Sequence, residues 1–505
     1  MRHFALGGDT GLLELEAYLA GMMPLPDLQR DLLAQVVNER IDELHEAARV
    51  PYSHGPPAGA PLDDLVGRLL GAAAPAESDP ADPPTGDAPP RSDPARTPAP
   101  QSALLTALLG PLEQSHRADS DELPALASAA FRTLGTDVTL YLADHDQRLL
   151  VPAVAGLPLH AVLGVQPLGV DSTLAGRAFR QVQVLASDAL ERPRLWVPLL
   201  DGTERLGVLE VHLTDPGDLA DQVLRQQCEH LASLLGHLVT SVGARGDGLD
   251  RVRRLRPRTT SAELVWQLLP PPTAENHVFS LSGWLEPADT VGGDIFDYAL
   301  SPTRASVAVF DAMGHGLPAG LMAAAALSAY RSARRNGCDL LAQAHAVDQT
   351  VSAVSPDGSF VTGFLGELDL VSGQLCYLSA GHPAALLLRG GKVVRALAEG
   401  RRVPFGLGQI AAASGPDDHV QDPLGQEDLQ PGDWLMVHTD GVSEARDARG
   451  AFFGDDRLAD FLQRAAAAGQ PPPETARRLA HAVLAHQHGQ LQDDATVLLG
   501  RWMPS

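Results

Sequence analysis

Four acidic segments in the second half of the chain each lie beside a short apolar run. They are Val291-Gly-Gly-Asp294, Phe310-Asp311-Ala-Met-Gly-His-Gly316, His438-Thr-Asp440-Gly441 and Gln492-Asp493-Asp494. A single Asp-Gly pair is a common turn, because both residue types favour turn conformations. Carboxylates brought together from four distant segments, however, would repel one another and have raised pKa values unless cations neutralised them. The recurrence therefore indicates one shared cation site.

The ligand types favour particular metals and a particular reaction. Carboxylates without spaced cysteines or histidines suit Mg²⁺ or Mn²⁺. Two such ions about 3.5–4 Å apart can share a carboxylate, carry a bridging hydroxide and clamp a phosphoryl oxygen. This arrangement hydrolyses phosphate esters without a covalent nucleophile, and the sequence contains no Cys-x5-Arg loop that would supply one. The residues therefore indicate phosphate-ester hydrolysis.

Apolar runs predict the elements that must position these carboxylates. Strands are expected at Val307–Phe310, at Trp434–His438 and at Ala495–Leu499, each next to an acidic turn. A helix is expected to begin at Pro318 and to end near Asn336-Gly337, since proline suits the first helical turn and glycine the position after the last.

Together with further motifs, these segments closely resemble the PPM family of metal-dependent protein serine/threonine phosphatases. The resemblance is to the bacterial branch typified by the stage II sporulation protein E (SpoIIE) and the sigma-regulator phosphatases, and it covers about residues 264–502. The further motifs are Trp266-Gln-Leu-Leu-Pro270, Phe360-Val-Thr-Gly-Phe364, Leu378-Ser-Ala-Gly-His-Pro383, Pro404-Phe-Gly-Leu-Gly408, Leu429-Gln-Pro-Gly-Asp433 and Thr439-Asp-Gly-Val-Ser-Glu-Ala445. The resemblance implies an α-β-β-α sandwich with the metal site at one end.

The resemblance also implies a role for each site residue. Asp311 is expected to bridge both Mn²⁺ or Mg²⁺ ions, and the Ala312 carbonyl to complete the second ion's shell. Asp440 and Asp493 are expected to hold the first ion, while Asp294 acts directly or through a bound water. Asp297 and Asp494 are expected to support the ligands or to form turns, and His315 and His382 to support either the ligands or the fold. Asp433, in a Pro-Gly-Asp turn, is expected to be structural.

Changes in composition divide the rest of the chain. Residues 1–72 contain one helical pattern, formed by Leu28, Leu32, Val36 and Leu44, to which no role is assigned. Residues 73–100 are rich in proline and have no apolar period, which predicts a disordered linker. We expect a sensor domain over residues 101–243, a linker with a regulatory helix over 244–272, and a phosphatase domain over 273–505.

The predicted sensor alternates short strands with a few helices, typical of an α+β domain. Strands are expected at 138–143, 148–154, 184–186, 195–200 and 206–212, with a helix at 174–180. The region resembles a GAF domain through Ser172-Thr-Leu-Ala-Gly-Arg-Ala178, Val182-Gln-Val-Leu-Ala-Ser-Asp188, and Val197-Pro-Leu-Leu followed by Leu206-Gly-Val-Leu. This implies a small-molecule or protein signal of unknown identity. Cys228 is expected to be a buried structural thiol, and the pair His145-Asp146 to lie in a turn.

Two helical patterns separate the predicted sensor from the predicted phosphatase. The first has apolar residues at spacings of four and three, namely Leu224, Cys228, Leu231, Leu235, Leu238 and Val242. This seam favours a coiled coil in a parallel homodimer, the alternative being a helix packed on its own domain. Thr260-x-x-Glu263 has capping-box spacing and predicts the start of a short regulatory helix. Five arginines between residues 251 and 258 are expected to make internal contacts.

Composition excludes several partners and compartments. The 38 Lys and Arg against 63 Asp and Glu give a net charge of −25, which argues against nucleic acid and anionic membranes as partners. Three cysteines are too few for a disulfide framework, and no signal peptide or apolar run of about 18 residues is present. A cytoplasmic protein is therefore expected.

These observations predict a sensor-regulated protein serine/threonine phosphatase. The family resemblance implies that its substrate is a phosphorylated anti-sigma-factor antagonist in a partner-switching pathway that regulates a sigma factor. One alternative is a non-catalytic module for ligand sensing and partner binding, which loss of the acidic positions would favour. The other is a two-metal hydrolase of nucleotides or cyclic dinucleotides, which a base-stacking pocket or a histidine-rich ligand set would favour. The sequence contains all the acidic positions, and neither a base-stacking pocket nor a histidine-rich ligand set is found in it.

Overall fold

The computed structural model describes residues 100–154, 166–188, 193–286, 292–355, 358–408, 424–489 and 491–504. The chain divides into two units, Met1–Leu105 and Thr106–Ser505, and every strand described here belongs to the second. The helix predicted around Leu28–Leu44 and the proline-rich segment before residue 100 lie outside the described residues. Within the described ranges, no helix combines the length and the apolar character needed to span a bilayer.

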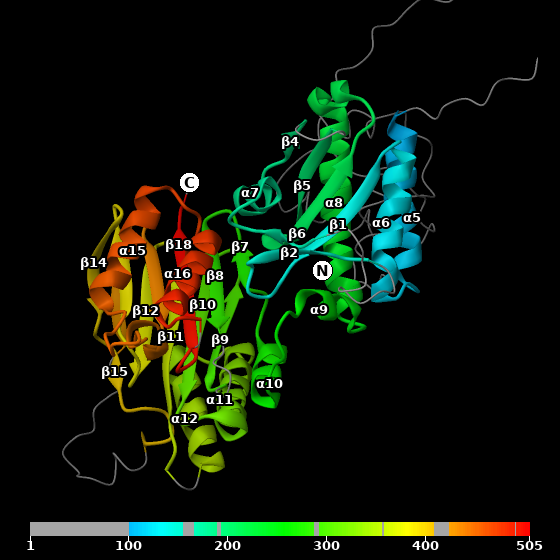
Figure 1. The fold of residues 1–505 in the computed structure, drawn as a ribbon. Coiled ribbons are helices and arrows are strands. Elements are labelled where there is room, and N and C mark those ends of the chain that lie inside the picture. The colour runs from blue at the N-terminus through cyan, green and yellow to red at the C-terminus, as the bar shows by residue number, and fades with distance from the viewer. Residues whose placement is uncertain are drawn as a thin grey trace, which may run out of the picture. The chain divides into compact units, whose positions relative to one another are not determined.

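An α/β part precedes the sandwich (Figure 1). Its antiparallel six-stranded sheet has the order β3-β2-β1-β6-β5-β4. The strands are β1 (Asp137–Ala143), β2 (Leu149–Pro152), β3 (Leu168–Gly169), β4 (Leu185–Ser187), β5 (Arg194–Asp201) and β6 (Glu204–His212). The helices are α5 (Pro100–Ser115), α6 (Leu123–Thr133), α7 (Leu174–Gln181) and α8 (Gln222–Gly243). Each strand and helix predicted between residues 138 and 212 is thus present, within a few residues of its predicted bounds.

The apolar seam of α8 faces its own domain. Cys228, Leu231, Leu235, Leu238 and Val242 are each at most 2% exposed, and α8 packs against β5 and α6. Gly236 allows the close approach, because a Cβ atom there would lie 1.8 Å from the Leu200 carbonyl oxygen. The coiled-coil interpretation of this seam is therefore wrong: the sheet covers the residues that a partner helix would need, and the seam lends no support to a homodimer.

Cys228 and Cys338 provide a test of this packing. Cys228 is fully buried, and burial raises its pKa to about 12, whereas Cys338 is exposed. Only the thiolate is nucleophilic, so Cys338 is expected to react with iodoacetamide at pH 8 while Cys228 stays unmodified until the protein unfolds. Peptide mass spectrometry of the alkylated chain measures both sites. Equal labelling of the two cysteines under native conditions would contradict the packing of α8.

Two short helices connect the α/β part to the sandwich, α9 (Gly248–Arg253) and α10 (Thr260–Leu268). The N-cap of α10 is Thr259, whose hydroxyl accepts from the Ala262 amide. The capping box predicted at Thr260 is therefore wrong by one residue, and Glu263 instead forms an ion pair with Arg254. The other arginines of this segment also contact the chain itself, as expected: for example, Arg258 lies over the Trp266 ring, 3.7 Å from its centroid.

Two six-stranded sheets form the C-terminal sandwich. The first has the order β15-β12-β11-β10-β9, with β16 on β12, and the second the order β14-β13-β17-β18-β8-β7. The strands of the first are β9 (Asp294–Leu300), β10 (Arg304–Ala312), β11 (Val361–Asp369), β12 (Gln374–Ala380), β15 (Arg401–Arg402) and β16 (Gly425–Asp428). Those of the second are β7 (Thr273–Glu275), β8 (Phe279–Glu286), β13 (Ala385–Arg389), β14 (Lys392–Leu397), β17 (Trp434–His438) and β18 (Ala495–Trp502).

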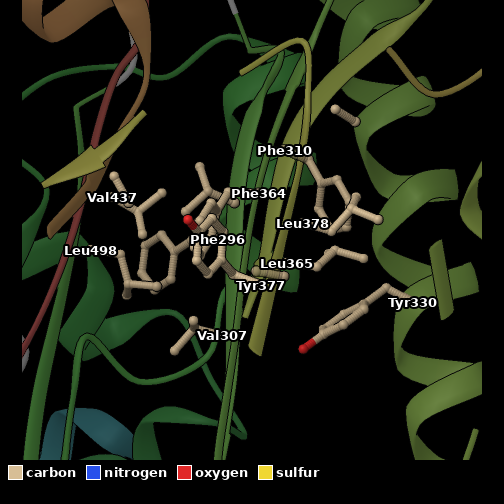
Figure 2. Packing of buried hydrophobic residues seen from close by; sticks show 14 of the residues in the cluster. Phe296, Val307, Phe310, Tyr330, Phe364, Leu365, Tyr377, Leu378, Val437 and Leu498 are labelled. Carbon is tan, nitrogen blue, oxygen red and sulfur yellow. The ribbon is translucent and has the colours of Figure 1, made fainter. Parts of the chain in front are cut away.

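Helices cover both sheets, which gives the predicted α-β-β-α layering. The helices α11 (Gly316–Arg335) and α12 (Leu340–Val354) pack on the first sheet, and α15 (Asp455–Ala467) and α16 (Pro472–His486) on the second. Figure 2 shows the continuous apolar core, in which Phe296 and Phe364 meet Val437 and Leu498 while Phe310 packs beside Tyr330 of α11. This core fixes the strand ends that carry the acidic turns.

Candidate metal centre

Strand pairing in the first sheet brings together two of the predicted site residues. Asp294 is the first residue of β9, Asp311 is the penultimate residue of β10, and the antiparallel register places them directly opposite each other. The Ala312 amide donates to the Gly293 carbonyl at 3.1 Å, and a Cβ atom on Gly293 would lie 2.7 Å from the Ala312 carbonyl oxygen. The predicted carbonyl ligand thus lies at the same strand end as both carboxylates.

Asp294 is the most deeply buried of the four predicted carboxylate ligands, at 3% exposure. Its Oδ2 accepts from the hydroxyls of Thr439 at 2.8 Å and Thr496 at 2.7 Å. Its pKa is raised well above the ordinary value, first by burial and then by the charges of Asp311 and Asp494. Both threonines were missed by the sequence analysis, although Thr439 directly precedes Asp440 and Thr496 lies two residues beyond Asp494.

The second sheet contributes the other two carboxylates. Asp440 begins α14 (Asp440–Ser443), directly after β17, and Asp493 precedes β18, which pairs with β17. The Thr439 amide donates to the Thr496 carbonyl at 3.1 Å, which fastens the two acidic turns together. Gly441 is required at this point, because a Cβ atom there would lie 1.9 Å from the Asp494 carbonyl oxygen.

The four predicted carboxylates share one electrostatic field. Burial, followed by the negative charges of Asp440, Asp493 and Asp494, raises the pKa of Asp311 to about 7. Burial also raises the pKa of Asp493, as do the charges of Asp440 and Glu444. No three His, Cys, Asp or Glu side chains among the described residues already form a metal-ligand set. The four carboxylates thus lie in one field without forming such a set, and their oxygen donors and unbalanced negative charge are of the kind that hard divalent cations bind.

Of the three neighbouring aspartates, one contacts the carboxylate cluster and two make their contacts elsewhere. Asp494 supports the site, since its Oδ2 accepts from the Gly293 amide at 2.8 Å and the Asp294 amide at 3.3 Å. Asp297 faces away from the cluster, where it pairs with Arg331 and Arg334 of α11. Asp433 holds Arg389 and the Gln430 amide, which is the structural role expected for it.

The two predicted histidines have different environments. His382 is buried, and its Nδ1 lies 3.1 Å from the Thr362 hydroxyl, which in turn lies 3.5 Å from Asp311 Oδ2. Burial lowers the pKa of His382 to about 3, so the imidazole is neutral at physiological pH. His315 is exposed at the start of α11, and its side chain does not cap that helix.

The connecting helix α10 contacts the loops that carry the acidic residues. The Ser261 hydroxyl lies 3.0 Å from the Gly316 carbonyl oxygen and 3.3 Å from that of Gly292. Gly292 and Gly316 directly flank the segments of Asp294 and Asp311. Movement of α10 would therefore move both loops.

Comparison with known protein families shows which family the C-terminal sandwich resembles. Residues 301–503 match the family Stage II sporulation protein E (SpoIIE). These residues form a SpoIIE-family domain. The C-terminal half of the chain thus carries a SpoIIE-type PPM phosphatase domain, as the motifs predicted. Asp311, Asp440 and Asp493 lie inside the matched range, and Asp294 lies on the strand that precedes it.

Individual proteins that are similar to this chain match it over only part of their own length. Phosphoserine phosphatase RsbU of Bacillus subtilis is 23% identical over 215 residues, which are 43% of this chain and 61% of RsbU. Protein IcfG of Synechocystis is 29% identical over 103 residues, 20% of this chain and 15% of IcfG. Among solved structures, the RsbU and RsbW domains of Rv1364c from Mycobacterium tuberculosis are 27% identical with a TM-score of 0.36, covering 45% of this chain and 62% of that one. The SpoIIE domain therefore accounts for the C-terminal half alone, and the GAF resemblance of the α/β part stays a prediction.

Proposed function

We propose that this chain is a metal-dependent protein serine/threonine phosphatase. The observation that carries the proposal is the convergence of Asp294, Asp311, Asp440 and Asp493 from both sheets on one negative field within a SpoIIE-type fold. Such a field is costly without cations, so the fold keeps these carboxylates together for a purpose other than stability.

The residues of the site would have distinct roles in binding ions and in orienting the carboxylates. Asp311, Asp440 and Asp493, with the Ala312 carbonyl, would hold two Mn²⁺ or Mg²⁺ ions. When bound, such ions supply a hydroxide nucleophile at neutral pH and neutralise charge on a phosphoryl group. The Thr439 and Thr496 hydroxyls fix the orientation of the Asp294 carboxylate, and Asp494 fixes the Gly293 backbone beneath it. Asp294 is thereby positioned to bind a cation or a water molecule.

The proposed substrate is a phosphoserine or phosphothreonine of a protein, specifically an anti-sigma-factor antagonist in a partner-switching pathway. The name of the relative RsbU, a phosphoserine phosphatase, supports the reaction. The test is hydrolysis of matched phosphoserine, phosphothreonine and phosphotyrosine peptides, and of a cyclic dinucleotide, by the full chain with Mn²⁺. Release of phosphate from the first two substrates is expected. Preference for the cyclic dinucleotide would contradict the proposal.

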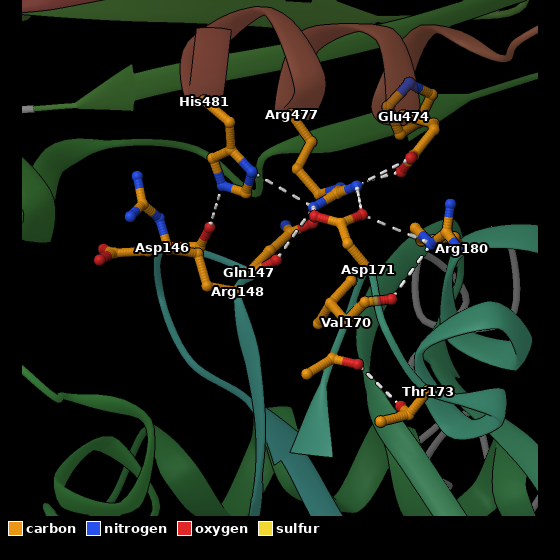
Figure 3. Close-up of polar contacts among 12 residues, drawn as sticks. Asp146, Gln147, Arg148, Val170, Asp171, Thr173, Arg180, Glu474, Arg477 and His481 are labelled. Carbon is orange, nitrogen blue, oxygen red and sulfur yellow. Dashed lines mark hydrogen bonds and ion pairs between the residues drawn. The ribbon is translucent and has the colours of Figure 1, made fainter. Parts of the chain in front are cut away.

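We further propose that the α/β part regulates the phosphatase domain. Figure 3 shows the polar contacts between α16 and the α/β part, with Arg477 at their centre. Arg477 is fully buried and donates to both Asp171 and Glu474, at 2.8 and 2.9 Å, and to the Gln147 carbonyl at 3.2 Å. Buried Arg205 donates from β6 to the same Glu474 carboxylate at 3.1 Å. Helix α16 packs on β8 and β18, and β18 directly follows Asp493-Asp494. The contacts of Arg477 and Glu474 are therefore linked through α16 to the strand end that carries the site.

Removal of residues 1–243 tests this regulation. The deletion takes away Asp171, Arg205 and the sheet that surrounds Arg477, so we expect a changed specific activity or a changed Mn²⁺ dependence. Both quantities are measured by phosphate release across a Mn²⁺ titration of the full and the shortened chain. Identical curves for the two proteins would show that the α/β part exerts no control.

A further inference from the structure

A cavity of about 310 Å³ lies outside the carboxylate cluster, where the α/β part, the connecting segment and both sheets of the sandwich meet. Its apolar wall consists of Trp266, Trp284, Phe296 and the prolines of residues 270–272. Glu204, the first residue of β6, lies in its polar wall beside Gln147 and Arg253. Enclosed sites of roughly 300–1,000 Å³ with aromatic walls and a few polar groups are typical of small-molecule binding, and they often occur where domains meet.

Glu204 is a charged group of this cavity that has no partner among the described residues. Its carboxylate makes no hydrogen bond or ion pair with any of the described residues, whereas Arg253 directs its Nε to the Ala143 carbonyl at 3.0 Å. Burial raises the pKa of Glu204, and Arg253 opposes that shift only from beyond ion-pair distance. A partly buried carboxylate without a partner is costly, and an incoming cation would offset that cost.

The walls of the cavity are fixed by contacts around its rim. The Gln147 side chain accepts from Arg205 at 3.2 Å, and its carbonyl accepts from Arg477. The Thr203 hydroxyl donates to that of Thr273 at 3.1 Å, and the Tyr298 hydroxyl donates to the Pro271 carbonyl at 2.8 Å. A site with walls held in this way binds a ligand without first having to order them.

From these observations we propose that this cavity binds a small organic cation, a protonated amine attached to an apolar or aromatic body. The ammonium group would pair with Glu204, and the apolar body would lie among Trp266, Trp284 and Phe296. Aromatic faces attract cations, and Trp266 already carries such a contact from Arg258. The volume is roughly ten times the share of liquid volume taken by one water molecule, which limits the ligand to about ten non-hydrogen atoms. A ligand there would touch the α/β part, the phosphatase domain and the segment that connects them.

Matched charged probes test the proposal on the full chain. We expect 2-phenylethylammonium to bind saturably at millimolar concentration and to change the tryptophan fluorescence, while 3-phenylpropionate, of similar size and opposite charge, does not. Tryptammonium, whose own indole fluoresces, is expected to bind saturably in calorimetric titrations. In calorimetric titrations, Glu204→Gln should weaken amine binding at least tenfold, and the control Glu229→Gln, at an exposed position on α8, should leave it unchanged. Trp266→Leu should also weaken binding.

Three results would overturn the proposal. They are the absence of saturable amine binding up to 10 mM, equal binding of the amine and the carboxylate probe, and unchanged affinity in Glu204→Gln. The glutamine variant is expected to keep or raise the wild-type melting temperature, since it removes a costly charge that has no partner to lose, so a folding defect would not mask the result. Because binding rather than turnover is measured, the outcome does not depend on the proposed phosphatase activity.

Discussion

Replacing Asp440 by asparagine is expected to lower phosphate-ester turnover by about 10³-fold, which corresponds to roughly 4 kcal/mol of lost transition-state stabilisation. The amide keeps the shape of the side chain but removes one of the negative charges that surround Asp311. A neutral amide holds a divalent cation far less well than a carboxylate does. The measurement is the initial rate of phosphate release at saturating Mn²⁺.

A matched variant separates this effect from a general loss of charge. Asp460 lies exposed on α15, where its one ion-pair partner among the described residues is Arg464, one turn later, so Asp460→Asn should keep the wild-type rate. The far-UV circular dichroism of both variants should match the wild type, because Asp440 is half-buried at the start of α14 and is not part of the apolar core. A nearly full rate in Asp440→Asn would mean that Asp440 does not hold a catalytic ion.

Replacing Glu474 by glutamine is expected to lower the free energy of unfolding by about 3–5 kcal/mol, the range found when one member of a buried ion pair is removed. Glu474 is the carboxylate that Arg205 and Arg477 share, and all three side chains are buried. Burial already lowers the pKa of Arg205, which shows how poorly solvated its charge is. Without Glu474, two buried guanidinium groups would face each other with less compensation. Urea denaturation of the full chain measures the loss.

Asp171 provides the control for this prediction. It also pairs with Arg477, but its side chain is 62% exposed, so Asp171→Asn should cost less than about 1 kcal/mol, as exposed pairs do. Equal effects of Glu474→Gln and Asp171→Asn would show that the burial of this cluster does not determine its contribution to stability.

Local sequence patterns predicted the acidic segments and eight of the strands that the structure describes, namely β1, β2, β4, β5, β6, β10, β17 and β18. The segments around Asp311 and Asp440 combine an apolar strand with an Asp-Gly or Gly-rich turn, and both signals lie within a few neighbouring residues. The structure accordingly places these carboxylates at strand ends, with Asp294 opposite Asp311. The individual metal-binding roles of these residues stay predictions.

Features that depend on tertiary packing were missed or misjudged. The α8 seam has the spacing of a coiled coil, but the same spacing arises when a helix packs on a sheet, and only the position of β5 distinguishes the two. Arg477 and Asp171 are 306 positions apart, and nothing near either residue signals their contact. Thr439 and Thr496 could have been found from their places beside the acidic motifs, but their shared target, Asp294, becomes visible only when the two sheets are stacked.

The most direct measurement is hydrolysis of p-nitrophenyl phosphate by the purified full chain, with Mn²⁺ added or removed by a chelator, in the wild type and in Asp311→Ala. If the carboxylate cluster is a two-metal phosphatase centre, turnover will require Mn²⁺, will disappear on chelation and will be lost in the variant, since Asp311 lies at the centre of the shared field. Turnover that persists without metal, or that survives in Asp311→Ala, would contradict this assignment.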